Sequence, residues 1–100
     1  MTRPLRVELV PAALAEAQDA RRWYAARSPE AADRFMAELD RVVGMIAESP
    51  TRWPEYRGSA RRVRLRRFPY FAIYRIQPEM VLIVAIAHHR RKPGYWQRRL

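Results

Sequence analysis

An unbroken run of eight apolar residues, Met80 to Ala87, constrains the fold of this chain more than any other feature. Eight residues are too few to cross a bilayer, and four of them are β-branched, which favours a strand over a helix. A strand that is apolar at every position, rather than at alternate positions, is typically covered on both faces of its sheet. The sequence therefore predicts a central strand with a neighbouring strand on either side.

The chain before this run supplies two helices and three further strands. Ser28 and Pro29 combine a helix-capping serine with a proline at the first helical position, so a helix begins there. Apolar residues spaced three or four apart indicate that both helices pack on a core. The expected elements are strands at 5–10, 61–68 and 70–76 and helices at 11–26 and 28–48. The expected apolar stripes are Leu14, Ala17, Ala20 and Tyr24 on the first helix and Phe35, Leu39, Val42, Val43 and Ile46 on the second.

These elements follow the order β-α-α-β-β-β in a single domain over residues 1–100. Residues 50–60 contain two prolines, a glycine and no periodicity, which is typical of a loop. The last three strands, at about 61–89, form a meander, and the N-terminal strand pairs with the free side of the last one. The predicted fold is α+β, with a four-stranded, mainly antiparallel sheet and a helical hairpin at about 11–48 on one face. Too little chain remains to cover the other face, which leaves a groove or a partner-binding surface there.

Positive charge is concentrated in the second half of the chain. Residues 1–50 carry seven arginines against eight acidic residues, whereas residues 51–100 carry thirteen lysines and arginines against two glutamates. Twelve of those thirteen cations are arginines, which pair bidentately with phosphate or carboxylate. We therefore expect an anionic partner, which is a nucleic acid, a ribonucleoprotein or an acidic protein.

Composition also limits the compartment and the chemistry. The chain has no cysteine, which excludes disulfides and thiolate chemistry. The first nine residues are typical of a strand rather than a signal peptide, so we expect a cytoplasmic protein without a membrane partner. His88 and His89 are adjacent, so a strand would point them to opposite sides, and no acidic residue lies near them. No metal or other cofactor is expected. The sequence also lacks a nucleophile elbow and a glycine-rich phosphate loop.

Two groups of basic and aromatic residues form the candidate site. Arg62, Arg64 and Arg66 alternate with apolar residues, so they share one face of a strand. In a ribonuclease, arginines would stabilise the phosphorane charge while histidine or tyrosine moves protons. The alternative without catalysis is a strand face exposed to solvent, or a surface on which a partner protein docks. Runs of charged residues usually face solvent or bind a partner. The second group lies at the exit of the last strand and in the basic tail at 90–100: His88, His89, Arg90, Arg91, Lys92, Tyr95 and Trp96.

Three stretches carry a resemblance to a known family: the helix start SPEAADRF, the run RRVRLRRFPYFAIYRI and the exit VAIAHHRRKPGYWQRRL. In this order they resemble the toxins of bacterial type II toxin–antitoxin modules of the RelE/ParE superfamily, over nearly the whole chain. The resemblance implies a growth inhibitor, of the kind linked to plasmid stabilisation. It also implies a cognate antitoxin whose acidic, disordered C-terminal segment wraps around the toxin. Operator DNA would be contacted only through that antitoxin.

The superfamily has two branches, and single positions bear on the choice. The RelE branch is similar to ribosome-dependent mRNA endonucleases; Arg62 and Arg64 match its second-strand cations, and Arg90 or Arg91 its later arginine. However, Phe71 and Trp96 stand where that branch has an arginine and a tyrosine. Phe71 carries no charge for the phosphate, and Trp96 cannot transfer a proton from oxygen. The resemblance therefore implies the ParE branch, whose members inhibit DNA gyrase without being enzymes.

Under the ParE interpretation no catalytic residue is assigned. An acidic, disordered segment would gain from folding onto an arginine-rich face, so we expect nanomolar or tighter antitoxin binding that salt weakens. Two alternatives stay open: a RelE-like mRNA endonuclease acting on the ribosome, and an inactive toxin that only binds its antitoxin and represses their operon. The endonuclease would use His88, His89, Arg90, Arg91 and Tyr95. The binding surface predicted for target or antitoxin is Arg62, Arg64, Arg66, Arg90, Arg91, Lys92 and Trp96.

Overall fold

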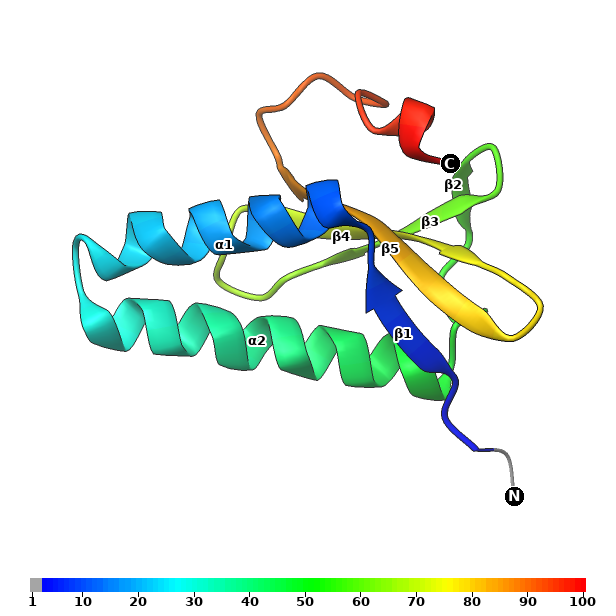
Figure 1. Ribbon diagram of the computed structural model, residues 1–100, viewed down its shortest axis with the longest axis horizontal. Coiled ribbons are helices and arrows are strands. Elements are labelled where there is room, and N and C mark those ends of the chain that lie inside the picture. The colour runs from blue at the N-terminus through cyan, green and yellow to red at the C-terminus, as the bar shows by residue number, and fades with distance from the viewer. Residues whose placement is uncertain (1–2) are drawn as a thin grey trace.

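Two helices lie against one face of a five-stranded sheet in the computed structural model, which describes residues 3–100 (Figure 1). The strand order is β1-β5-β4-β3-β2; β1 runs parallel to β5, and every other pair is antiparallel. This confirms the predicted α+β class and the mainly antiparallel sheet. No helix in the described residues has an apolar stretch long enough to span a bilayer. The elements are β1 (Arg6–Leu9), α1 (Pro11–Ala25), α2 (Pro29–Glu48), β2 (Glu55–Arg57), β3 (Ala60–Arg64), β4 (Tyr70–Ile76), β5 (Met80–His88) and a final 3₁₀ turn, η1 (Gln97–Arg99).

The apolar run forms β5, which lies between β1 and β4 as predicted. Its register with β4 shifts once, because Ile73 pairs with Ala85 while Tyr74 pairs with Ile83. Val84 therefore has no counterpart on β4, as in a β-bulge. As a result, Val84 and Ala85 both lie in the same buried cluster, on the side of the sheet away from the helices.

The number of strands was predicted wrongly, because the segment expected to be a loop at 50–60 contains β2. This strand has only three residues, too few for an alternating pattern to be visible in the sequence. It pairs with β3 through a tight turn in which Gly58 adopts a φ of 55°, a left-handed conformation that suits glycine. The sheet therefore has five strands rather than four.

The helix α1 is rotated relative to the prediction. Leu14 was expected in the core but is 48% exposed, whereas Ala13, Ala17 and Ala20 are buried. A helix that presents alanines can approach the sheet closely, and α1 lies directly over β5. The rotation also brings Glu16 to the border of the buried face.

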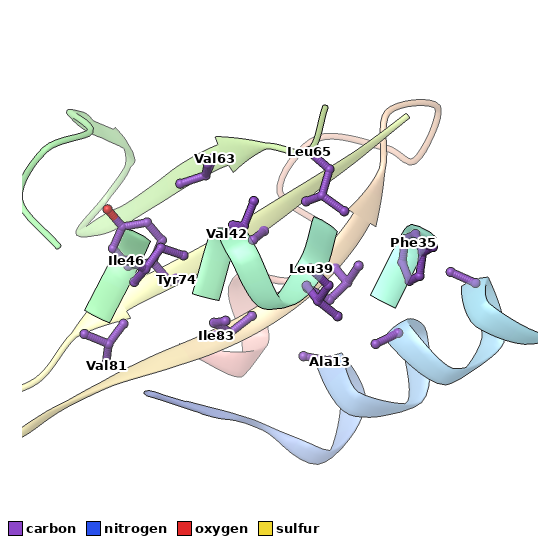
Figure 2. Packing of buried hydrophobic residues seen from close by; sticks show 14 residues of the cluster. Ala13, Phe35, Leu39, Val42, Ile46, Val63, Leu65, Tyr74, Val81 and Ile83 are labelled. Atoms are coloured by element: carbon purple, nitrogen blue, oxygen red, sulfur yellow. The ribbon is translucent and has the colours of Figure 1, made fainter. Parts of the chain in front are cut away.

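The larger core, here called the helix-side core, lies between the helices and the sheet (Figure 2). From α2 it takes the predicted apolar stripe, with Val43 only partly buried. The Ser28 Oγ caps α2 by accepting from the Ala31 N–H at 3.2 Å, as its position predicted. The buried residues of the helix-side core are Ala13, Ala17, Ala20, Phe35, Leu39, Val42, Ile46, Val63, Leu65, Ala72, Tyr74, Val81, Ile83 and Ile86.

The chain after β5 covers part of the opposite face of the sheet. In Figure 1 this tail, residues 89–100, leaves the end of β5, loops away from the helices and returns to finish near β2. Beneath it lies a smaller buried cluster, here called the tail-side core. Its members are Ala60, Ile73, Val84, Ala85, Ala87 and Trp96.

Candidate functional site

Two arginines of β3 lie exposed on the face of the sheet away from the helices. Because Val63 and Leu65 are buried in the helix-side core, alternation along the strand turns Arg62 and Arg64 to the other side. The Arg62 guanidinium carbon lies 4.0 Å from the centre of the Tyr56 ring and 4.8 Å from that of Phe71. The Arg64 guanidinium carbon lies 5.5 Å from the Phe71 centre. We call these four residues the arginine face.

Arg66 does not belong to this face, and its predicted position there was wrong. β3 ends at Arg64, and Arg67 adopts a φ of 66° as the chain turns toward β4. The Arg66 backbone N–H donates to Glu38 Oε2 at 2.6 Å, which ties the turn to α2. Arg66 lines a different cleft, on the helix side, together with Arg34 and other residues. Strand alternation cannot be extended past the residue where pairing stops.

His88 is the last residue of β5 and is held from two sides. Its Nδ1 accepts from the backbone N–H of Arg90 at 3.1 Å, which leaves Nε2 to carry the proton of the neutral ring. The ring meets Tyr70 edge to face at 5.1 Å between centres. Burial, together with the positive charges of His89 and Arg90, lowers the pKa of His88 below its ordinary value. The imidazole therefore favours its neutral form.

The two histidine rings lie together rather than on opposite sides of the strand. Their centres are 4.7 Å apart, with a tilt of 34°. The predicted separation was wrong because β5 ends at His88, and the His89 N–H instead donates to the Pro69 carbonyl at 2.8 Å in a turn. Among residues 3–100 no group of three metal-binding side chains is present.

Trp96 is buried, so its predicted place on an exposed binding surface was wrong. It is only 2% exposed and is the largest side chain of the tail-side core. Its ring also lies 6.4 Å from the ring of Tyr56, measured between centres. Trp96 therefore anchors the tail to the sheet.

Glu16 is the residue of this site that the sequence did not reveal. Its Oε1 accepts from the Ile86 N–H at 3.0 Å and from Arg99 Nη1 at 2.9 Å, and its Oε2 accepts from the Tyr95 hydroxyl at 2.6 Å. The side chain is only 16% exposed. Glu16 accepts a backbone hydrogen bond from β5 beyond the residues that pair with β1, and it binds two residues of the tail. The one signal in the sequence is a glutamate in an alanine-rich helix, one residue before Ala17.

The Tyr95 hydroxyl is held by its hydrogen bond to Glu16. Burial and the hydrogen bond to the Glu16 carboxylate raise the pKa of the Tyr95 phenol far above its ordinary value. The Arg91 guanidinium carbon lies 3.8 Å from the centre of the Tyr95 ring. A phenol held in this way keeps its proton at neutral pH, so it is poorly suited to act as a general base.

A small hollow of about 80 Å³ joins the arginine face to the tail. It brings seven of the predicted site residues around one point, although Trp96 contributes from its buried position. Arg64 borders the same surface through its contact with Phe71, while Arg66 and Arg90 do not line the hollow. The predicted residues that line it are Arg62, His88, His89, Arg91, Lys92, Tyr95 and Trp96.

The cations of this surface have almost no acidic partners. Of the thirteen lysines and arginines in residues 51–100, all within the described part of the chain, only Arg99 forms an ion pair within 4.0 Å, with Glu16. The other twelve have no carboxylate partner at this distance, although the Arg61 guanidinium donates to the Trp53 carbonyl. The arrangement is therefore suited to anion binding.

Comparison with known proteins places this geometry in a family. The family model described as the ParE toxin of the type II toxin–antitoxin system, parDE, matches residues 7–93. The chain belongs to this ParE toxin family. Among solved structures, the fold is similar to that of a chain from the chromosomal ParDE toxin–antitoxin system of P. aeruginosa, with a TM-score of 0.75 and 18% identity over 87% of this chain and 98% of that chain. A search of curated proteins finds no match.

The family match confirms the resemblance to the ParE branch of the RelE/ParE superfamily. In this ParE-type toxin, the two positions that pointed away from the RelE branch have structural roles. Phe71 supports Arg62 and Arg64 on the arginine face, and Trp96 fills the tail-side core. Neither residue provides an exposed cation or a hydroxyl at the site.

Proposed function

We propose that this ParE-type toxin arrests growth by inhibiting DNA gyrase, as a binding protein rather than as an enzyme. The observation that carries this proposal is the state of the tail. Tyr95 donates its hydroxyl hydrogen to Glu16, and Trp96 is buried. Among the residues predicted for acid–base catalysis, only the two histidines then remain available. Stable binding of a large target requires no proton transfer and is compatible with this arrangement.

We also propose that a cognate antitoxin neutralises the toxin through an acidic, disordered segment. Two findings support this: the matched family is described as part of a toxin–antitoxin system, and the similar structure is of a ParDE system. The unpaired cations of residues 51–100 would attract such a segment, which folds as it binds. The surface expected to bind target or antitoxin is Arg62 and Arg64 with Arg90, Arg91 and Lys92. Gyrase as the target makes the cytoplasm the expected location, and operator DNA would be reached only through the antitoxin.

The proposal is tested by adding the purified toxin to a gyrase supercoiling assay with relaxed plasmid. We expect supercoiling to fall as toxin is added, and to recover when the co-purified antitoxin is added in equal amount. A ribosome-dependent translation reaction with the same toxin serves as a parallel assay and should be unaffected. Undiminished supercoiling at a large excess of toxin would refute the gyrase proposal.

The second candidate is a ribosome-dependent mRNA endonuclease, favoured by one observation. The His88 and His89 rings lie 4.7 Å apart beside a hollow that Arg62 and Arg91 also line. Mapping RNA 5′ ends after induction of the toxin separates the two candidates. New ends inside translated codons, lost on His88→Ala and His89→Ala substitution, would establish the endonuclease. Growth that continues normally after induction would instead establish an inactive toxin that only binds its antitoxin and represses their operon.

A further inference from the structure

The arginine face combines cations that lack acidic partners with aromatic rings. On the helix side, Arg41 is paired with Glu38 and Arg22 with Asp19. On the arginine face, Arg62 and Arg64 are exposed and have no carboxylate within 4.0 Å among residues 3–100. Their positive charge is therefore uncompensated within the described chain.

Aromatic rings hold these guanidinium groups in place. Arg62 lies between two rings, at 4.0 Å from the Tyr56 centre and 4.8 Å from the Phe71 centre, and Arg64 lies over the same Phe71. Arg57 adds a fourth contact, 5.6 Å from the Tyr56 centre. A guanidinium that is supported on an aromatic ring loses less freedom when it binds a ligand. Its planar face is also a surface on which a nucleobase stacks.

We propose that the arginine face binds single-stranded polynucleotide. The guanidinium groups of Arg62 and Arg64 would contact backbone phosphates, and bases would stack on the layered arginines and rings of Tyr56 and Phe71. The hollow beside it extends the positive track along the tail through Arg91 and Lys92. Alternation of cations with aromatic rings is the usual construction of sequence-tolerant single-strand binding surfaces.

Two features favour this ligand over other anions. A run of acidic side chains satisfies the charge of the arginines but leaves their planar faces, which are supported on the rings of Tyr56 and Phe71, without a stacking partner. Duplex DNA offers phosphates, but its bases are stacked inside the helix and are not available to the face. The proposed binding requires no cleavage of the strand, because the arginines bind phosphate without transferring protons and Tyr95 is held by Glu16.

This inference goes beyond gyrase inhibition and does not require it. The test uses only purified toxin and oligonucleotides, so it succeeds or fails whether or not gyrase is the target. If the same surface also receives the acidic antitoxin segment, the antitoxin and the polynucleotide compete for it.

The experiment measures fluorescence anisotropy of a short labelled oligothymidylate titrated with the full-length toxin at several salt concentrations. The Arg62→Gln/Arg64→Gln double variant is compared with Arg21→Gln/Arg34→Gln, which removes the same charge from exposed positions on α1 and α2. We expect the first variant to bind about tenfold more weakly, with a salt slope reduced by about 1.4 because two phosphate contacts are lost. The helix variant should keep the wild-type slope and nearly all of the affinity.

Ligand and ring variants complete the test. Unlabelled oligouridylate should compete as well as oligothymidylate, since the proposed contacts do not read the sugar; duplex DNA and polyglutamate should compete at least tenfold less well. Tyr56→Leu and Phe71→Leu, checked for folding by circular dichroism, should each weaken oligothymidylate binding about fivefold through lost stacking. Equal competition by polyglutamate, or equal loss in the two double-arginine variants, would overturn the proposal and leave a surface with only general charge attraction.

Discussion

The two faces of the sheet are covered in very different ways. On one face, α1 and α2 bury fourteen residues in the helix-side core. On the other face, a twelve-residue tail covers the smaller tail-side core of six residues, to which it contributes Trp96, and Tyr95 packs against this core while partly buried. Two exposed arginines of β3, Arg62 and Arg64, lie on the side that the tail covers only in part.

The two faces are held to their covering segments by different kinds of interaction. The helix side depends on many apolar contacts spread over two long elements, so no single polar group controls it. The tail side depends largely on one indole and one carboxylate: Trp96 fills the tail-side core, and Glu16 binds Tyr95 and Arg99 on either side of Trp96 in the chain. A thin cover of this kind leaves the adjoining strand face open for ligands. Four substitutions or conditions distinguish the two faces.

The largest effect is expected on the helix side, for Phe35→Ala. Phe35 is fully buried and contacts the rings of Tyr24, Phe68 and Tyr70. Its removal should lower the free energy of unfolding by about 4 kcal/mol, as measured by urea denaturation. A loss below about 1 kcal/mol would mean that the helix-side core tolerates a large cavity. That result would contradict the dependence of this face on its apolar contacts.

On the tail side, Trp96→Ala should cost about 3 kcal/mol, because a buried indole is removed from a small cluster. Hydrogen exchange should show the loss of protection confined to residues 90–99. Trp23→Ala is the matched control, since Trp23 is 52% exposed and should cost less than about 1 kcal/mol. Equal effects for the two tryptophans would contradict the role of Trp96 as an anchor.

Glu16→Gln should cost roughly 2 kcal/mol, because the neutral amide loses the ion pair with Arg99 and replaces the acceptor of the Tyr95 hydroxyl by a donor. The tail should become more sensitive to limited proteolysis, while the helices stay intact. Asp19→Asn on the same helix breaks only an exposed pair with Arg22 and should change stability by less than about 0.5 kcal/mol. If the two variants behave alike, the tail is held by something other than Glu16.

The smallest effect concerns alkaline pH. Burial raises the pKa of Tyr74 to about 12, whereas the ordinary pKa of tyrosine is 10.0. Between these two pH values the phenol stays neutral in the folded protein but ionises in the unfolded chain. The stability that this phenol contributes is complete below about pH 10 and is lost as the pH rises toward 12. We expect a loss of about 1 kcal/mol by about pH 11 from this group. Melting curves of wild type and Tyr74→Phe should converge over this range.

Tyr95 serves as the comparison for this alkaline loss, since its raised pKa has the same sign on the tail side. Tyr95→Phe should also flatten the alkaline loss of stability, and it should in addition loosen the tail. A flat profile for wild type between about pH 9 and 12 would contradict both assignments.

Much of the fold followed from local patterns. The Ser28-Pro29 start of α2 and the bounds of β4 and β5 were predicted to within about a residue, because caps, breakers and apolar runs act over a few neighbouring residues. The pairing of β1 with β5 was also predicted, since an entirely apolar strand needs a neighbour on each side. The missed strand β2 was too short to carry a pattern.

The candidate site was predicted only where it lies on a regular strand. Arg62 and Arg64 are on the expected side of β3 because alternation holds as long as the strand is paired. Arg66, His89 and Trp96 were misplaced because each lies beyond the end of a strand, where the side-chain direction depends on the turn.

The sequence by itself determined the number of helices, the central position of β5, the concentration of arginine in the second half and the resemblance to the ParE branch. Only the tertiary structure decided which arginines stay open, where Trp96 lies, and that Glu16 joins α1 to the tail. The physical reason is distance along the chain: Glu16 and Arg99 are separated by 83 residues, yet their side chains meet at 2.9 Å. Local patterns report neighbours within a few residues, whereas contacts of this length exist only once the sheet and both of its covers have assembled.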